Sequence, residues 1–260
     1  MAKILPLCVL LWIVYFPACS QIRLEKLEIS YRQSYKIIGS DILVVDTLIM
    51  RDSSRIYLNP EIENNIINAK VLIAGKGTMI IGRGLNGKKG ATGTAGANQN
   101  APCRNGEDAL NGRNGEPAKN GLNLSLYVGT LKINGTLTID VNGGDGGDGG
   151  RGGRGGDGGS GTRVCRGGNG GKGGNGGNGS NGGNGGNVLL NCKNCQDLHL
   201  LQGHQLFIKN YGGFAGSGGD VGNGGRAGLG SKQDGKNGGR GVVGNQGTAG
   251  KTGIVTLEKS

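Results

Sequence analysis

Glycine returns at every third position through most of the chain after residue 83, and this period limits the possible folds more than any other feature. The frame is unbroken from Gly143 to Gly161 and from Gly167 to Gly185. Of the 260 residues, 60 are Gly, whereas an ordinary domain contains about 7% Gly. Such a chain cannot build the continuous apolar core of a Rossmann enzyme, a TIM barrel or a helical bundle.

The glycine frame divides into six segments that pair as three hairpins, 84–121, 143–186 and 213–253. In order, segments one to six are Gly84–Gly96, Gly106–Gly121, Gly143–Gly161, Gly167–Gly185, Gly213–Gly228 and Gly235–Gly253. A period of three is typical of the polyproline II helix, which rises about 3.1 Å per residue, so segment three would reach about 55–60 Å. A glycine row lets a neighbouring backbone approach and pair with the N–H groups that this helix cannot satisfy internally. Segments three and four carry two glycine rows, which predicts that they lie at the centre of the bundle.

Short runs rich in Ile, Leu and Val precede and separate the hairpins, and they are typical of β-strands. They are Asp41–Met50, Arg55–Leu58, Ala69–Ala74, Thr78–Ile81, Leu124–Val128, Thr130–Val141, Val188–Leu190, Leu198–Leu201, Leu206–Lys209 and Ile254–Leu257. We expect an all-β base, a short β-solenoid or sandwich, with three inserted hairpins that form a six-helix polyproline II bundle. The expected order is a signal peptide (1–20), a strand-rich base (21–82), hairpins alternating with strands (83–253) and a closing strand (254–260).

Two other structures compete for the glycine-rich tracts. A collagen triple helix also needs Gly at every third position, but it is rich in proline, and the whole chain has five prolines. Disorder is the general expectation for such composition, because ordering each residue costs about 1–2 kcal/mol. The maintained frame and the strands between hairpins favour the ordered bundle.

The first 20 residues have the layout of a secretory signal peptide, with Lys3, an apolar run from Ile4 to Phe16, and small residues after it. Phe16-Pro17-Ala18-Cys19 is similar to a bacterial lipobox, apart from its first residue, and makes Cys19 a candidate for lipidation. Removal of the whole stretch would instead leave Gln21 first. We therefore expect an extracellular or cell-surface protein, either secreted or an outer-membrane lipoprotein held only by a lipid anchor.

Four cysteines follow the signal peptide, and an even number in an exported, core-poor chain predicts disulfides. They are Cys103, Cys165, Cys192 and Cys195. Three pairings are possible, and spacing alone does not choose among them. The chain's two histidines, His199 and His204, follow Cys192 and Cys195 and complete a weak candidate zinc set, but a zinc finger separates its two pairs by about 12 residues and here three intervene. We expect no cofactor.

The formal net charge of +11 attracts an exported protein to polyanions such as acidic polysaccharide or an envelope surface. Arg151-Gly-Gly and Arg154-Gly-Gly are similar to nucleic-acid-binding boxes but lack interleaved aromatic residues, so we expect no nucleic-acid partner. Asp145, Asp148 and Asp157 share one row with these arginines, and no concave pocket is implied for catalytic carboxylates. The expected protein is not an enzyme.

Glycine-frame segments paired as hairpins, with cysteines in the turns, resemble the polyproline II bundle proteins, which include a snow-flea antifreeze protein and the receptor-binding tips of some phage tail-fibre adhesins. The resemblance covers roughly Gly84 to Gly253 and implies antiparallel left-handed helices joined by backbone hydrogen bonds. Cys103 and Cys165 both lie in hairpin turns, so stacked hairpins predict a disulfide between them. Cys192 and Cys195 would then bridge locally or stay reduced.

The function expected from these observations is that of a non-enzymatic structural or adhesive protein that presents a rigid glycine-rich bundle. The alternative is ice binding, which needs a flat face of small residues. The candidates for that face are Ala91, Thr92, Thr94, Ala95 and Ala97 in segment one, and Thr248, Ala249 and Thr252 in segment six.

Overall fold

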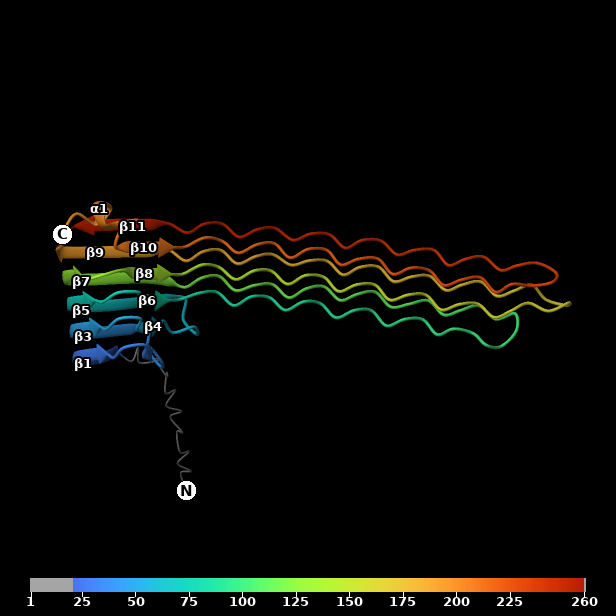
Figure 1. Ribbon diagram of the computed structural model, residues 1–260, viewed down its shortest axis with the longest axis horizontal. Helices are drawn as coiled ribbons and strands as arrows, with labels where there is room; N and C mark the ends of the chain where they lie inside the picture. Colours follow the sequence, from blue (N-terminus) through green and yellow to red (C-terminus); the bar gives the residue numbers. More distant parts are fainter. Residues whose placement is uncertain (1–20, 260) are drawn as a thin grey trace, which may run out of the picture.

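The computed structural model describes residues 21–259 and shows an elongated molecule, with a strand-rich base from which three long arms project in one direction (Figure 1). The signal peptide and the lipidation candidate Cys19 lie outside the described residues. The described chain is mostly parallel β-strand and extended segment, with one four-residue helix.

The base consists of two parallel β-sheets, and successive strands alternate between them, so the chain winds as a solenoid. The first sheet has the order β1 (Gln21–Ile29), β3 (Ile42–Met50), β5 (Asn64–Ala74), β7 (Asn123–Ile133), β9 (Val188–Asn194) and β11 (Val255–Lys259). The second has the order β10 (Leu206–Lys209), β8 (Leu137–Asp140), β6 (Thr78–Ile81), β4 (Arg55–Tyr57) and β2 (Ser34–Lys36).

Equivalent apolar residues of successive coils stack into columns between the two sheets. Leu48 of β3 lies opposite Leu72 of β5, which lies opposite Leu131 of β7, and all three are buried. Ile80 and Ile139 form a matching column in the second sheet. Burying a side chain of this size contributes about 1.5–3 kcal/mol, so the base holds the hydrophobic core that the arms lack.

The expected strands are present with three differences. β1 and β2 add a coil before Asp41, where no strand was expected. The runs on either side of Gly129 form one strand, β7, and the chain then turns at 134–136 into β8. Leu198–Leu201, expected as a strand, is instead helix α1, because the Asp197 side chain accepts the backbone N–H of His199 and caps the turn. That turn carries the chain from β9 to β10.

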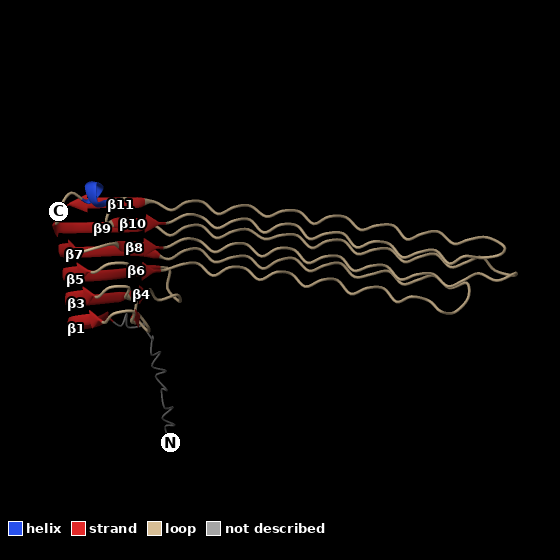
Figure 2. Ribbon diagram, in the orientation of Figure 1, coloured by secondary structure: helices blue, strands red, loops and turns tan. Residues whose placement is uncertain are grey.

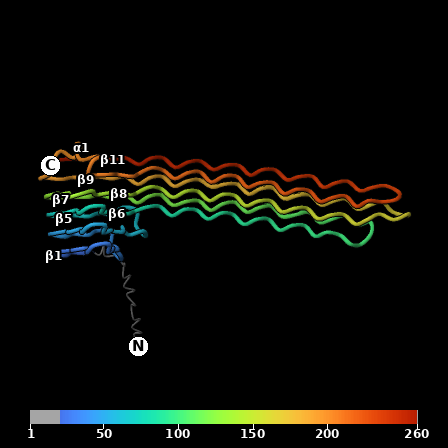
Figure 3. The backbone as a smooth tube through the Cα atoms, in the orientation of Figure 1, coloured from blue at the N-terminus to red at the C-terminus, as the bar shows by residue number. Residues whose placement is uncertain are grey.

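The three hairpins leave the base at the same corner of successive coils. Each departs from a strand of the second sheet (β6, β8 or β10) and returns into the next strand of the first sheet (β7, β9 or β11) (Figures 1 and 3). Neither helix nor strand is assigned within the six segments (Figure 2). Segments one, three and five therefore extend the second sheet, and segments two, four and six extend the first.

The strand register of the base continues unchanged along the arms. Thr78 of β6 lies opposite Leu137 of β8, and the Asn86 side chain in segment one meets the backbone of Asp145 in segment three at the same separation of 59 residues. The offset of 64 residues between segments two and four equals that between β7 and β9. The offset of 69 residues between β8 and β10 also separates segments three and five, and the offset of 67 residues between β9 and β11 also separates segments four and six. The base thus sets the register of every segment.

Three consecutive residues of a central segment donate hydrogen bonds in three directions. In segment four, the N–H of Gly170 donates to the carbonyl of Lys236 in segment six, 2.9 Å away, and that of Gly171 donates to Gly156 in segment three, 2.8 Å away. The N–H of Lys172 donates to the side chain of Asp108 in segment two, 2.6 Å away. In this triplet all three backbone donors are satisfied without an internal hydrogen bond.

The hairpin 143–186 lies at the centre of this network, as its two glycine rows predict. Segment three bonds to segments one, two, four and five, and segment four bonds to segments two, three, five and six. An added Cβ at either glycine row would collide with a neighbouring carbonyl group. Segments one, three and five form one layer, and segments two, four and six form a second layer that runs antiparallel to it. This arrangement differs from the three parallel chains of a collagen triple helix.

We expect Gly155→Val to destabilise the protein by several kcal/mol. Its Cβ would collide with the carbonyl of Gly171, and separating the two segments leaves amides unpaired at about 1–3 kcal/mol each. Gly239→Val is the matched control, because apart from its chain neighbours no atom of the described residues lies within 4 Å of a Cβ there, and it should change stability by only about 0.5 kcal/mol. Thermal unfolding followed by circular dichroism and calorimetry measures both variants. Equal melting temperatures would contradict the packing.

Candidate binding surface at the arm tips

The turns at the far ends of the three hairpins lie together because the segments share one register. We call this surface the arm tip and define it as residues 97–105, 162–166 and 229–234. The N–H of Cys103 donates to the carbonyl of Ser160, 2.9 Å away. The N–H groups of Gly161 and Gly167 donate to the carbonyls of Leu229 and Gln233. All three hairpins therefore contribute to one end of the molecule.

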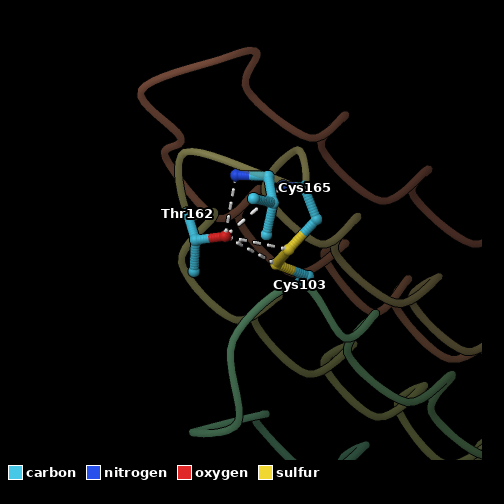
Figure 4. The surroundings of a disulfide bond; sticks show 4 residues. Cys103, Thr162 and Cys165 are labelled. Carbon is cyan, nitrogen blue, oxygen red and sulfur yellow. Dashed lines mark hydrogen bonds between the residues drawn. A yellow bond between two sulfur atoms is a disulfide. The ribbon is translucent and has the colours of Figure 1, made fainter.

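A disulfide between Cys103 and Cys165 joins the first two hairpins at the arm tip, with Cα atoms 6.1 Å apart (Figure 4). This is the pair expected from their positions in hairpin turns. The Thr162 hydroxyl lies beside both sulfur atoms, 3.3 Å from Cys165 Sγ and 4.0 Å from Cys103 Sγ. It also accepts the backbone N–H groups of Val164 and Cys165 at 3.3 Å. The turn is thus held by both a covalent bond and a local hydrogen-bond cluster.

The arm tip is basic and carries exposed apolar side chains. Its four exposed cationic residues are Arg104, Arg163, Arg166 and Lys232. Among the described residues none of these four forms an ion pair. Val164 is 84% exposed and Leu229 is 73% exposed. Unpaired cations beside apolar side chains suit an anionic partner that also offers apolar contact.

The zinc candidates lie in the base, at the opposite end of the molecule. Cys192 and Cys195 form a second disulfide, so neither sulfur is a free thiolate for a metal. His199 lies on α1, and His204 lies in the turn that follows it. Over residues 21–259 no group of three or more His, Cys, Asp or Glu side chains is arranged to hold a metal ion.

The small residues proposed for an ice-binding face are not brought together. Among the described residues, segment one bonds to segments two and three, and segment six bonds to segments four and five, so the two lie at opposite edges of the arms. Within segment one the Ala and Thr residues occupy two neighbouring rows, both exposed. The structure therefore provides two narrow strips rather than one flat face.

Sequence reasoning missed the role of the Asn and Asp row, which we name the Asx ladder. Its side-chain oxygens accept the backbone N–H of the equivalent residue in the next parallel segment. The acceptors are Asn86, Asn98, Asn105, Asp108, Asn111, Asn114, Asn120, Asn123, Asn142, Asp145, Asp148, Asp157, Asn169, Asn175, Asn178, Asn181, Asn184 and Asn187. The available signal was the recurrence of Asn or Asp after paired glycines.

Arg151 and Arg154 interrupt the Asx ladder, and Asp157 resumes it. The hydrogen bond from the Arg226 N–H, supported by the Arg154 guanidinium, lowers the pKa of Asp157 from its ordinary value of 3.8. The expected mixed-charge row is therefore partly a structural device, because Asp157 accepts a backbone N–H as well as an ion pair.

Comparisons with protein-family models, with curated proteins and with solved structures found no match to this chain. Within the described residues no helix has the length and apolar character needed to cross a membrane. The two disulfides indicate an oxidising environment.

We expect acid to weaken the arms through Asp157. Because its folded-state pKa is lowered, its contribution is present above about pH 3.8 and is lost as the pH falls through the folded value. Asp157→Asn keeps an oxygen for the Arg226 N–H but does not titrate, so its stability should fall less at low pH. Asp220→Asn removes a carboxylate with no hydrogen bond in the described chain and serves as control. Parallel pH curves of unfolding free energy for Asp157→Asn and the wild type would refute the assignment.

Removing the disulfide at the arm tip should cost more than removing the one in the base. The first closes a loop of 62 residues and the second one of 3, which correspond to about 4 and about 1.5 kcal/mol by the chain-entropy relation. Urea unfolding of Cys103→Ser/Cys165→Ser and Cys192→Ser/Cys195→Ser measures the two losses. A larger loss for the second variant would contradict the prediction.

Proposed function

We propose that this chain is a non-enzymatic structural or adhesive protein that acts outside the cytoplasm and holds a binding surface away from its base. The observation that carries the proposal is the shared register of base and arms. A solenoid that fixes three hairpins side by side makes a projecting element whose ends meet at one surface. Such an arrangement suits the presentation of a contact surface.

The arms are best explained as a bundle of six polyproline II helices. Three observations support this interpretation: the three-residue glycine period, the hydrogen bonds that repeat at every third residue, and the lack of helix or strand over the segments. Each helix has three sides, and in segments three and four two of these are glycine rows, with Ser180 as the single exception. A bundle of this kind is stiff because the backbone N–H groups of both glycine rows of the central segments donate to neighbouring segments.

The arm tip is the proposed contact surface, and an anionic polysaccharide or a similar envelope component is the proposed partner. Arg104, Arg163, Arg166 and Lys232 gather there, and none of them forms an ion pair within residues 21–259. The disulfide between Cys103 and Cys165 restricts the turns before binding, which reduces the entropy lost on association. Ice binding is less well supported, because its candidate residues lie on two opposite edges.

The proposal predicts that a soluble polyanion binds at the arm tip. Dextran sulfate is the probe, and isothermal titration at low and physiological salt is the measurement. The variant Arg163→Ala/Arg166→Ala/Lys232→Ala should lose about ten-fold in affinity and show a weaker salt dependence.

The matched control removes the same charge from the side of the arms, as Lys88→Ala/Arg113→Ala/Lys119→Ala. This variant should change the affinity by about two-fold or less. Equal losses in the two triple variants would show attraction by net charge alone and would contradict the assignment of the arm tip.

A further inference from the structure

A second surface of unusual chemistry lies where the arms join the base, on the face of the second sheet. Three of the seven aromatic residues after position 20 fall within eight positions, as Phe207, Tyr211 and Phe214. Phe207 is on β10, and the other two lie where the chain enters segment five. Their exposed fractions are 37%, 61% and 79%. Two of these exposed rings, Tyr211 and Phe214, lie together at the start of segment five.

Polar side chains with planar head groups lie beside these rings. Tyr211 and Phe214 line an open groove of about 590 Å³ together with Arg83, Asn86, Asn142 and Asp145. The common register arranges the six residues in two parallel rows where three neighbouring chain passes enter segments one, three and five. One row is Arg83, Asn142 and Tyr211, and the other is Asn86, Asp145 and Phe214.

The Asx ladder fixes the orientation of these polar groups before any ligand arrives. Asn86 Oδ1 accepts the Asp145 N–H, and Asn142 Oδ1 and Asp145 Oδ1 accept the N–H groups of Tyr211 and Phe214, each at 2.8 Å. Within the described chain the two amide Nδ2 groups and the second Asp145 oxygen have no partner. The groove therefore presents two donors and one acceptor in fixed positions, which lowers the entropy cost of binding.

The groove does not share the positive charge of the arm tip. The Arg83 guanidinium donates from Nε to Asp140 Oδ1 at 3.0 Å, and the Asp140 side chain is only 4% exposed. Asp145 adds a further negative charge to the lining of the groove. A polyanion would be repelled by Asp145, so the ligand class favoured at the arm tip is not favoured here.

We propose that this groove binds a neutral polysaccharide through its hexose units. A hexose offers hydroxyl groups that both donate and accept, which match the Asn amides and the Asp145 oxygen. Its C–H faces can stack on exposed aromatic rings. Tyr211 and Phe214 are three residues apart, about 9 Å along an extended helix of this type, so the two rings contact different units of one chain. The site goes beyond the proposed function of the arm tip and does not depend on it.

Titration of the full-length mature protein with neutral hexaoses tests the proposal. The probes are cellohexaose, laminarihexaose and mannohexaose, and the readouts are calorimetry and backbone amide chemical shifts. At least one probe should bind with a Kd below about 1 mM and shift the amides of Tyr211 and Phe214. Tyr211→Ala and Phe214→Ala should each weaken that binding about ten-fold.

Two further variants separate binding from folding. Asp145→Asn keeps an oxygen for the Phe214 N–H but turns the free acceptor into a donor, so it should weaken sugar binding at an unchanged melting temperature. Tyr127→Ala removes a tyrosine that is 39% exposed on β7, in the other sheet, and should bind normally.

Failure of all three hexaoses to bind, or equal binding by wild type and Phe214→Ala, would overturn the proposal. The triple variant at the arm tip should keep its sugar affinity, so the two sites are tested independently.

Discussion

The whole structure depends on the parallel hydrogen bond from one chain pass to the equivalent residue of the next. In the base this bond joins neighbouring strands of one sheet, such as β6 and β8. In the arms it joins the segments that continue those strands, such as segments one and three. The offsets of 59, 64, 69 and 67 residues apply to both parts. The apolar columns of the base therefore hold in register the arms, which have almost no apolar core of their own. The base supplies the apolar core and sets the register, and the arms extend that register away from the core.

The glycine frame made the arms predictable, because a repeat of three carries its own geometry. Two bare rows placed segments three and four at the centre, and cysteines in two turns predicted the bond from Cys103 to Cys165. What the frame could not give was the partner of the third N–H in each triplet. The Asn175 side chain accepts a hydrogen bond from the N–H of Val242, 67 positions later. The sequence pattern within one segment does not identify this partner, because the separation depends on the lengths of the intervening strands and turns.

The base was harder to predict than the arms, for physical reasons. β1 is amphipathic, with Lys, Glu and Arg between its apolar residues, and it lies at the edge of a sheet, where only one neighbour selects for strand character. Leu198–Leu201 has the composition of a strand but follows Asp197, whose side chain caps a helical turn. For β1 the edge position, and for α1 the hydrogen bond accepted by the Asp197 cap, mattered more than the apolar pattern. The groove at the junction could not be predicted from the sequence either, because the six residues that carry its chemistry come from three separate parts of the chain.

The same register explains why the bundle stops at six segments. Leu85 in segment one corresponds to Gly144 in segment three, because the offset is 59 residues, and Leu85 is 64% exposed. At the other edge Val243 in segment six corresponds to Gly176 in segment four, with the offset of 67 residues, and is 60% exposed. A further segment would need glycine at these positions to come within hydrogen-bonding distance. Side chains on the outer rows block that approach, much as charged or bulky residues protect the edge of a β-sheet from adding another strand.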